Sequence, residues 1–277
     1  MSIHLFPLVY IIILNWNGKT DTIECLYSLQ TISYPNYKII IVDNASGDGS
    51  VQALRSEFPT LEIIENQKNL RFAGGNNIGL RYALEKNAEY VLLLNNDTIV
   101  EKNFLFELVH CAENDERVGI AGAKIYYYTE KNKIWYAGGK IAWNIGWISH
   151  RGIRETDFNQ YDQEEETDYV TGCCMLLRRN LIEEIGLLDE AYFIYGEDAD
   201  WCMRAKNNGY KLMYVPTAKL YHKVSISSGG NFSWFKNWNK LKSNFRFFFR
   251  YAKWYQIALL PFAMVIKVTI SFIHARK

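Results

Sequence analysis

Short, continuous apolar runs alternate with amphipathic segments through the first part of the chain. The apolar runs are rich in β-branched residues and lie at 9–14, 38–42, 61–64 and 90–94. The segments between them repeat their apolar positions with helical spacing, at 20–31, 49–58 and 76–87. Strands that are apolar on both faces and alternate with helices are typical of a parallel sheet covered on both sides. We therefore predict an α/β fold with a mostly parallel sheet flanked by helices.

The pattern changes after a predicted helix at 101–113. Strands with glycine turns are expected at 118–128, 134–148 and 169–177, short helices at 180–185 and 197–207, and a last strand region at 211–222, broken by Pro216. Residues 155–168 hold seven acidic side chains and are expected to form a solvated loop. We expect one domain over residues 1–228, with halves at 1–100 and 101–228, and a helical tail over residues 229–277.

Charge is distributed very unevenly along the 277 residues. The net charge of +1 combines 17 basic and 30 acidic side chains in residues 1–200 with 14 basic and no acidic ones in residues 201–277. A tail this basic indicates an anionic partner, such as a membrane surface or a nucleic acid. Hydrophobic residues make up 49% of the chain, which allows a substantial core and argues against disorder.

The cysteines and the N-terminus bear on the compartment. Five cysteines without zinc spacing, two of them adjacent, indicate free thiols in a reducing environment. The apolar run at 8–14 is too short to cross a membrane, and no basic segment precedes it. We interpret it as a buried strand and expect a cytoplasmic protein.

Polar residues follow the ends of the predicted strands, at 15–18, 43–46, 66–75 and 95–97. Because ligands bind beyond the carboxyl ends of parallel strands, these residues are expected to converge on one edge. Asp43 suits a bond to a nucleobase or ribose and equally an Asx turn. The paired glycines of residues 71–77 open a helix whose N-terminus suits phosphate, although a plain glycine turn is the stronger interpretation of the segment alone. Neither a dinucleotide fingerprint nor a P-loop is present.

Asp97 brings a carboxylate from the end of a buried strand to the same edge. Magnesium or manganese bound to a substrate diphosphate needs only one or two protein carboxylates, since phosphates and water supply the other ligands. The alternative is a helix cap near Glu101, and the position at the sheet edge favours the metal. His222 follows the last strand, and a lone histidine of this kind is by itself more often structural.

The segment 193–201 crowds Glu197, Asp198 and Asp200 among aromatic residues at a predicted helix start. Acidic side chains at a helix N-terminus are favoured by the backbone dipole, so capping is one explanation. Capping needs only one or two of them, and it leaves the aromatic neighbours unexplained. A carboxylate desolvated beside aromatic rings has a raised pKa and is suited to act as a general base.

Taken in chain order, these segments resemble the family 2 inverting glycosyltransferases of the GT-A fold, particularly the rhamnosyltransferase-like branch. The resemblance spans roughly residues 8–225 and rests on six motifs, at 13–17, 42–46, 69–77, 94–97, 171–176 and 196–204. It implies a GT-A-like catalytic domain over residues 1–228, with a nucleotide-binding half at 1–100 and an acceptor-binding half at 101–228.

The resemblance also assigns roles to individual residues. It makes Asp198 the catalytic base. Glu197, Asp200 and Trp201 support the base or the acceptor, and Glu197 or Asp200 either orients the base or serves the acceptor. Thr171 and Gly172 line the donor-sugar pocket, and Asp97 with His222 binds Mg²⁺ or Mn²⁺. The first acid of the family's D-x-D metal motif is replaced here by Asn95. The implied nucleotide-binding residues are Asn15, Asn17, Asp43, Asn69, Arg71, Gly75, Asn76, Asn95 and Asn96.

The implied reaction transfers a sugar, rhamnose or a hexose, from a dTDP- or UDP-sugar to a hydroxyl of a glycan acceptor, with inversion at the anomeric carbon. A glycosidase would instead need two carboxyl groups flanking the bond, about 5–10 Å apart. Two further hypotheses stay open. A sugar-phosphate nucleotidyltransferase would share the sheet, but its basic glycine-rich loop is missing after Leu14. A non-catalytic glycan- or nucleotide-binding subunit of an assembly complex would explain Asn95.

The tail adds a predicted membrane contact. Aromatic residues recur at roughly helical spacing from Trp234 to Phe249, interleaved with lysines and arginines, as in interfacial membrane helices. Residues 255–273 are largely apolar but contain Pro261 and Lys267, so they suit an in-plane segment at least as well as a span. The alternative is an amphipathic helix packed on the catalytic domain or a partner. Residues 232–277 are thus expected to contact the inner face of the cell membrane, where a lipid-linked glycan would be the acceptor. Nucleic-acid binding is disfavoured because no nucleic-acid module is present.

Overall fold

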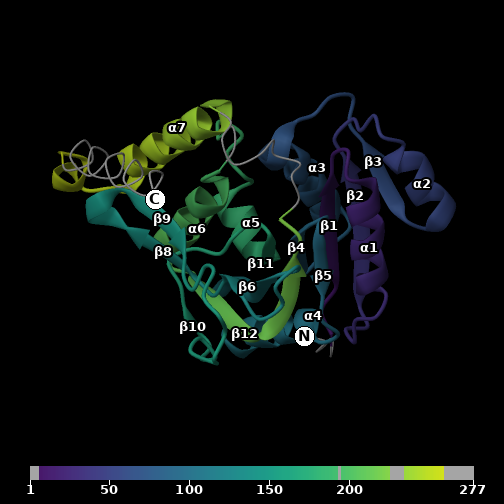
Figure 1. The fold of residues 1–277 in the computed structure, drawn as a ribbon, viewed down its shortest axis with the longest axis horizontal. Coiled ribbons are helices and arrows are strands. Elements are labelled where there is room, and N and C mark those ends of the chain that lie inside the picture. The colour runs from purple at the N-terminus through teal and green to yellow at the C-terminus, as the bar shows by residue number, and fades with distance from the viewer. Residues whose placement is uncertain (1–5, 193–194, 225–233, 259–277) are drawn as a thin grey trace.

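The structure is a computed structural model that describes residues 6–192, 195–224 and 234–258. Its centre is a ten-stranded mixed sheet with helices on both faces (Figure 1). This is the α/β architecture that the apolar runs predict. The elements are described below in the order in which they build the candidate site.

One half of the sheet is parallel. Its strands are β1 (Val9–Asn15), β2 (Tyr37–Asp43), β3 (Glu62–Glu65) and β4 (Tyr90–Asn95). β1 lies between β4 and β2, and β3 pairs with the far side of β2. The connecting helices are α1 (Lys19–Leu29), α2 (Ser50–Glu57) and α3 (Arg71–Glu85). Because these strands run in the same direction, the loops that follow β1, β2 and β4 share one edge.

The other half is mixed. Its strands are β5 (Thr98–Val100), β6 (Val118–Tyr127), β7 (Ile134–Tyr136), β10 (Glu165–Glu166), β11 (Cys174–Arg178) and β12 (Lys211–His222). β11 runs antiparallel between β4 and β6, and β12 runs parallel to β6. The helices of this half are α4 (Phe104–Asn114), α5 (Arg179–Ile185) and α6 (Glu197–Asn207). A separate hairpin consists of β8 (Gly139–Ala142), the short η1 (Trp143–Ile145) and β9 (Trp147–His150).

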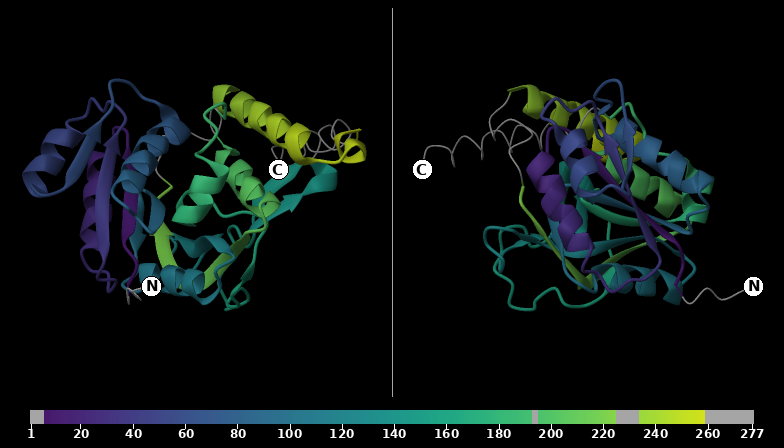
Figure 2. Two further views of the ribbon diagram at one scale, coloured as in Figure 1. Left: turned by 180° about the vertical axis from the view of Figure 1, so that it is seen from behind. Right: turned by 90° about the vertical axis from the view of Figure 1, so that its right-hand side faces the viewer.

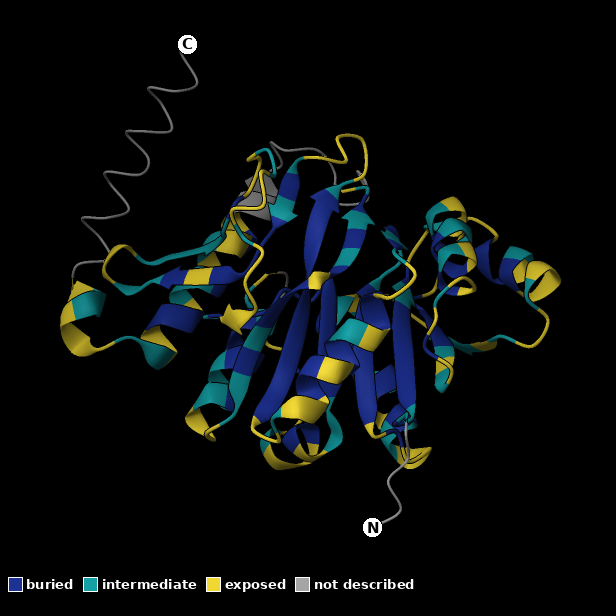
Figure 3. Ribbon diagram, turned by 90° about the horizontal axis from the view of Figure 1, so that it is seen from below, coloured by how far each residue is buried: buried dark blue, intermediate teal, exposed yellow. Residues whose placement is uncertain are grey.

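Alternate residues of the strands fill two separate cores. On one face, Val9, Ile11 and Ile13 of β1 pack with α1, α2 and α4. On the other face, Tyr10 and Ile12 pack with α3, α5 and α6. Figure 3 shows the strands as almost wholly buried and the helices as exposed on their outer sides. Coverage of both faces explains why the strands are continuously apolar.

The strands with glycine turns expected at 134–148 are observed, because Gly138 and Gly146 adopt φ angles of 100° and 61°, which favour glycine and turn the chain between short strands. Two other strand predictions in the second half are wrong. β12 is not broken at Pro216 but continues past it, with a register shift against β6 that places the proline in an irregularity of the ladder. The strand expected at 169–177 begins only at Cys174.

The acidic loop at 155–168, expected to be solvated, is partly held by ion pairs to the sheet. Lys124 of β6 is wholly buried, and its Nζ lies 2.6 Å from a carboxylate oxygen of Asp157 and 2.7 Å from one of Asp162. Tyr126 donates a further hydrogen bond of 2.6 Å to Asp157. A buried ammonium group is stable only when it is paired. Two of the loop's acids therefore fasten it to the sheet.

The helix α7 (Trp234–Tyr251) lies across α6 and the hairpin of β8 and β9 (Figures 1 and 2). Phe247 and Phe248 are buried, with ring centroids 5.9 and 5.8 Å from that of Trp143. One face of the predicted amphipathic helix thus packs on the domain, while Trp238 and Phe249 are exposed on the other. Most of the predicted segment at 255–273 lies outside the described residues. In the part that the structure describes, no helix has the length and apolarity needed to cross a membrane.

Candidate active site

The loops after β1, β2 and β4 meet at the side chain of Asn15. This amide is buried, and its Nδ2 donates to Asp43 Oδ2 at 2.7 Å and to Ser46 Oγ at 3.1 Å. Its Oδ1 accepts from Thr22 Oγ1 at 2.8 Å and from Asn96 Nδ2 at 3.4 Å. Each of the three strand ends supplies one member of this network. The predicted convergence of polar residues at one edge is therefore observed.

The side chain of Asp43 accepts a local backbone hydrogen bond from three residues on, one residue further than in the Asx turn that the sequence left open. The backbone N–H of Ser46 donates to Asp43 Oδ1 at 2.8 Å, and the side chain of Asp43 is almost wholly buried. Asn17, with a φ of 52°, closes the same corner by donating from its backbone N–H to Ser46 Oγ at 2.9 Å. Its Oδ1 accepts from the N–H of Gly47 at 2.8 Å. Asp43 thus shapes the corner, and the exposed Asn17 lies on its surface.

The helix α3 begins at Arg71, five residues before its predicted start, so its paired glycines are helical. A Cβ on Gly75 would lie 2.4 Å from Leu14 Cδ1 and 2.9 Å from Asn44 Nδ2, so only glycine allows this close approach. Asn69 Oδ1 accepts from the N–H of Arg71 at 2.7 Å, where the φ of Arg71 is 63°. The glycine pair is therefore a packing device that brings Arg71 to the site edge.

Asn76 and Asn77 hold α3 in place. The buried Asn76 donates from Nδ2 to the carbonyl oxygen of Phe72 at 3.0 Å, so it bonds to its own helix and does not face the edge. Asn77 exchanges two hydrogen bonds of 3.0 Å with the backbone of Leu188 and donates to Glu190 at 2.9 Å. The sequence motif contained Asn77, but no local signal identified its partners, which are more than 110 positions away.

Asp97 and His222, far apart in the sequence, form a close pair. β5 pairs with β12 so that Thr98 lies opposite His222, and this register brings His222 Nε2 within 3.0 Å of Asp97 Oδ1. Both side chains are almost buried, and His222 Nδ1 has no hydrogen-bond partner. Within the described residues, no group of three or more potential metal ligands occurs. The backbone N–H of Asn95 donates to the carbonyl oxygen of Cys173 at 2.9 Å.

An aromatic layer that the sequence did not single out supports His222. The Trp135 ring packs edge-on against His222, with centroids 4.5 Å apart, and against His150, 4.4 Å away. The Trp135 carbonyl oxygen lies 3.3 Å from His150 Nδ1. Burial lowers the pKa of His150 to about 4, so this ring is neutral at neutral pH. The three Trp residues of 135–150, followed by His150, were the only signal in the sequence.

Asp198 lies in the first turn of α6 and faces the loop that precedes β11. Its Oδ2 accepts from the N–H of Gly172 at 3.1 Å, and its Oδ1 accepts from the N–H of Ala199 at 2.8 Å. A Cβ on Gly172 would lie 2.8 Å from Phe72, so glycine is needed there. Thr171 is buried beside it, and its Oγ1 accepts from the N–H of Cys173 at 3.4 Å. Burial raises the pKa of Asp198, and the N–H donors oppose that rise.

Glu197 is the second carboxyl group of this turn. It is 7% exposed, and its Oε2 has no hydrogen-bond partner. Burial raises its pKa, and the negative charge of Asp198 raises it further. The N-cap residue of α6 is Gly196, which has no side chain to cap the helix. Of the three acids, Asp198 bonds to a first-turn N–H, that of Ala199, so capping explains at most part of the cluster and leaves Glu197 unexplained.

Asp200 and Trp201 are further residues of α6 in the same motif. Asp200 is wholly buried and accepts hydrogen bonds from Arg204 at 3.0 Å and from Arg250 at 2.9 Å. Trp201 is wholly buried in the core and donates from Nε1 to the carbonyl oxygen of Gly186 at 2.8 Å. The sequence interpretation left open whether these residues support the base or the acceptor. Both side chains lie in the interior.

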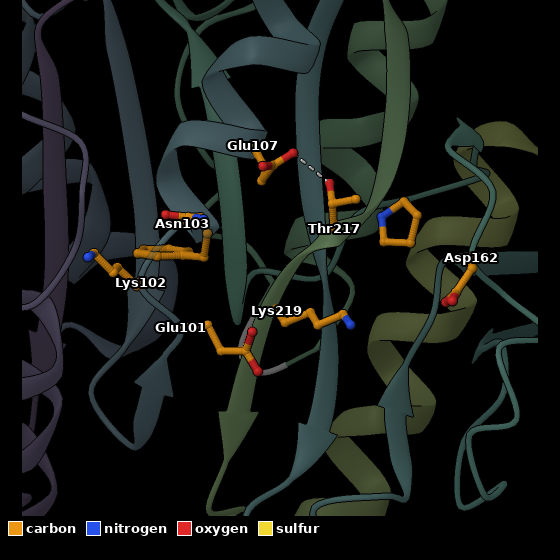
Figure 4. Close-up of a pocket in the computed structure, with 9 residues that line it drawn as sticks. Glu101, Lys102, Asn103, Glu107, Asp162, Thr217 and Lys219 are labelled. Carbon is orange, nitrogen blue, oxygen red and sulfur yellow. Dashed lines mark hydrogen bonds between the residues drawn. The ribbon is translucent and has the colours of Figure 1, made fainter.

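A pocket of about 320 Å³ lies between α4 and the Pro216 region of β12, as Figure 4 shows. Two of its polar side chains are paired with each other, since Thr217 Oγ1 donates to Glu107 at 2.8 Å. Another of its carboxylates, Glu101, accepts from Tyr221 at 2.9 Å. None of the sequence-predicted site residues lines this pocket. The candidate site is therefore the edge described above.

Comparison with known proteins identifies the family. The model of the family described as "Glycosyl transferase family 2" matches residues 10–186. The chain is 25% identical to the dTDP-rhamnosyl transferase RfbF of Shigella flexneri over 79% of its length and 70% of that protein. It is 28% identical to the rhamnosyltransferase WbbL of Escherichia coli K12 over 88% of its length and 93% of that protein. An N-acetylglucosaminyl-diphospho-decaprenol L-rhamnosyltransferase of Mycobacterium tuberculosis is 25% identical over 74% of the chain and 72% of that protein.

Solved structures share the fold. A structure of GalNAc-T7 with UDP, GalNAc and Mn²⁺ matches with a TM-score of 0.70 at 17% identity, over 88% of this chain and 48% of that one. The mannosyltransferase PcManGT of Pyrobaculum calidifontis, with GDP-Man and Mn²⁺, matches with a TM-score of 0.65 at 18% identity, over 96% of this chain and 75% of that one. The predicted GT-A-like sheet is thereby confirmed. The matched model covers more than half of the chain, and the protein belongs to glycosyl transferase family 2.

Proposed function

We propose that this glycosyltransferase is inverting and metal-dependent, and that it transfers rhamnose or a hexose from a nucleoside-diphosphate sugar to a hydroxyl of a glycan. The observation that carries the proposal is the desolvated Asp198 carboxyl group, held by the N–H of Gly172 at 3.1 Å. Adjacent Glu197 and Asp198 do not flank a bond from two sides, as the carboxyl groups of a glycosidase do. One base with a raised pKa suits a single displacement.

In this mechanism Asp198 accepts the proton of the acceptor hydroxyl as its oxygen attacks the anomeric carbon. A new C–O bond forms while the bond from that carbon to the diphosphate oxygen breaks, so the configuration inverts. The electron pair of the broken bond leaves with the nucleoside diphosphate. The N–H groups of Gly172 and Ala199 keep the carboxylate oriented before proton transfer. Glu197 stays protonated beside it, because two adjacent buried carboxylates repel each other.

The proposed metal ligands are Asp97 and His222. A carboxylate oxygen and an imidazole nitrogen 3.0 Å apart, with His222 Nδ1 unpartnered, fit Mg²⁺ or Mn²⁺ when a diphosphate and water complete the coordination. The ion would neutralise the charge of the leaving diphosphate. Trp135 restrains the His222 ring, and a restrained ligand favours one coordination geometry.

The proposed donor is a dTDP- or UDP-sugar. The names of the relatives support dTDP-rhamnose, and UDP and GDP-mannose appear with the structural neighbours. Asn17 and Arg71, at the corner formed by Asn15 and Asp43, are proposed to contact the nucleotide. A calorimetric titration with dTDP, UDP and GDP, each with and without Mn²⁺, tests this proposal. Binding of one nucleotide that Mn²⁺ strengthens in the wild type, but not in His222→Ala, is expected, and no binding of any nucleotide would contradict the proposal.

The proposed acceptor is a lipid-linked glycan, and the proposed location is the inner face of the cell membrane. A decaprenol-linked acceptor is named for the mycobacterial relative. Exposed aromatic side chains of Trp238, Phe249 and Trp254, beside the basic residues of α7, suit an anionic lipid surface. One alternative remains, a non-catalytic binding subunit. Asp198→Asn separates it from a catalyst, since a catalyst loses turnover and keeps donor binding, whereas a binding subunit is unaffected.

A further inference from the structure

The carboxylate of Asp200 joins three separate parts of the chain. It is wholly buried and is surrounded by four donors. They are Arg204 Nε at 3.0 Å, Arg250 Nη1 at 2.9 Å, Tyr251 Oη at 2.8 Å and Tyr192 Oη at 3.2 Å. Charge-assisted hydrogen bonds of this kind are among the stronger polar contacts in a protein. This ion has no role in the proposed chemistry, yet it is the most heavily bonded group near the base.

Only some of these donors fix α6 against other elements. Arg204 belongs to α6 itself, so its bond to Asp200 cannot set where the helix lies. Arg250 and Tyr251 belong to α7, and Arg250 also lies 3.2 Å from Asp189 in the segment before α6. Arg246, one turn earlier in α7, reaches Asp189 at 3.2 Å but not Asp200. Arg250 and Tyr251 therefore clamp the start of α6, whereas Arg246 contacts only the segment before it.

The turn that leads into α6 needs such a clamp. Tyr195 and Gly196 have φ angles of 67° and 92°, two consecutive residues in the left-handed region. A backbone turn of this kind persists only when its surroundings determine it. A Cβ on Gly196 would lie 3.7 Å from Ser243 of α7, so the same helix also packs on the turn. Asp198 lies two residues beyond Gly196, in the turn that Asp200 completes.

We propose that Arg250 and Tyr251 are positioning residues for sugar transfer, which hold Asp200 so that the first turn of α6 presents Asp198 to the acceptor. This inference rests on the proposed role of Asp198 as the base. Neither residue touches the reacting atoms. Their contribution is the placement of the base, and a base displaced by about 1 Å can lose on the order of a hundredfold in rate.

The test compares Arg250→Met and Tyr251→Phe with the matched control Arg246→Met. Tyr251→Phe keeps the ring that packs 5.1 Å from Phe247 and removes only the hydroxyl, so it folds even if Arg250→Met does not. For Tyr251→Phe we expect kcat to fall about tenfold or more, with the Kd for the nucleotide unchanged within about twofold. The control is expected to retain its kcat. A wild-type kcat in Tyr251→Phe would overturn the inference, as would an equal loss of nucleotide affinity.

A second measurement separates this inference from the proposed function. Hydrogen exchange of the amides of Ala199 and Asp200 reports how firmly the first turn of α6 is held, whether or not any sugar is transferred. Faster exchange in Tyr251→Phe than in Arg246→Met is expected, and equal exchange would overturn the clamp. If the wild type transfers no sugar at all, the proposed function fails, while the exchange result still decides whether α7 holds this turn.

Discussion

The contact between Gly75 and Asn44 links helix packing to nucleotide binding. A methyl group at position 75 would lie 2.4 Å from Leu14 Cδ1, against an ordinary carbon separation of roughly 3.5–4.0 Å. Leu14 has a side chain that can rotate, whereas Asn44 is held by several hydrogen bonds. It donates to the carbonyl oxygen of Arg71 at 3.1 Å and accepts from Asn66 at 2.8 Å. Gly75→Ala therefore pushes on the group that positions Arg71.

Two opposing terms set the stability of Gly75→Ala. Overpacking lowers the free energy of unfolding by about 1–3 kcal/mol, and replacing a helical glycine by alanine raises it by about 1 kcal/mol. The free energy of unfolding is therefore expected to fall by about 1 kcal/mol, which urea denaturation measures. A displacement of Arg71 by about 1 Å is expected to weaken nucleotide binding by at least about tenfold, because the lost contacts are polar and directional.

Gly79→Ala is the matched control. It lies one turn further along α3, and a Cβ there would be 2.6 Å from Ile12 Cγ2, in the core and away from the site edge. It is expected to lose similar stability and to keep its nucleotide affinity in a calorimetric titration. The reasoning is refuted if both variants lose affinity equally, or if Gly75→Ala binds nucleotide as the wild type does.

Three further predictions concern other parts of the molecule. Lys124→Met removes the buried cation that pairs with Asp157, and we expect it to lower the free energy of unfolding, measured by urea denaturation, by about 3 kcal/mol. A decrease of less than about 1 kcal/mol would contradict this prediction. Because burial raises the pKa of Asp198, its neutral form stabilises the fold at low pH, and that contribution is lost as the pH rises through the raised pKa. Asp198→Asn is therefore expected to have a higher Tm than the wild type at pH 7 but not at pH 3. The kcat of the wild type is expected to rise between these two pH values. If the Tm difference between variant and wild type is the same at both pH values, Asp198 is not a desolvated base. Phe249 and Trp254 are 61% and 81% exposed. The double variant Phe249→Ser and Trp254→Ser is expected to lose sedimentation with anionic vesicles and to keep nucleotide binding. Unchanged sedimentation would rule out this surface as the membrane contact.

The parallel half of the fold was predictable because its strands are buried on both faces. The sequences of such strands are uninterrupted apolar runs, and each of the four runs corresponds to a strand within a few residues of its expected bounds. The second half was less predictable. Its strands β7, β8 and β9 are three or four residues long, which is too short to recognise a strand from its alternation of apolar and polar residues. Pro216 was misinterpreted because an irregular ladder tolerates proline where a regular one does not.

The candidate site divides in the same way. Asp43, Asp97 and Asp198 could be proposed as site residues because each lies at a recognisable local pattern, a strand end or a helix start. The partners of Asp200 could not be predicted, because two of them, Arg250 and Tyr251, lie 50 and 51 positions away. Trp135 was hidden for a related reason, since its contact with His222 depends on how two strands pack. Long-range pairing of this kind is a property of the folded chain and not of any local segment.

The pair of Asp97 and His222 has a consequence for the order in which the protein assembles. The two residues are 125 positions apart, and their contact depends on β12, one of the last strands to be synthesised. The parallel half, by contrast, closes short loops between neighbouring segments, and short loops cost less entropy to close. During synthesis the corner around Asn15 can therefore form while His222 is still inside the ribosome. The pair proposed to bind the metal is complete only after β12 has joined β5 and β6, so the half proposed to bind nucleotide is expected to fold before the half that completes this pair.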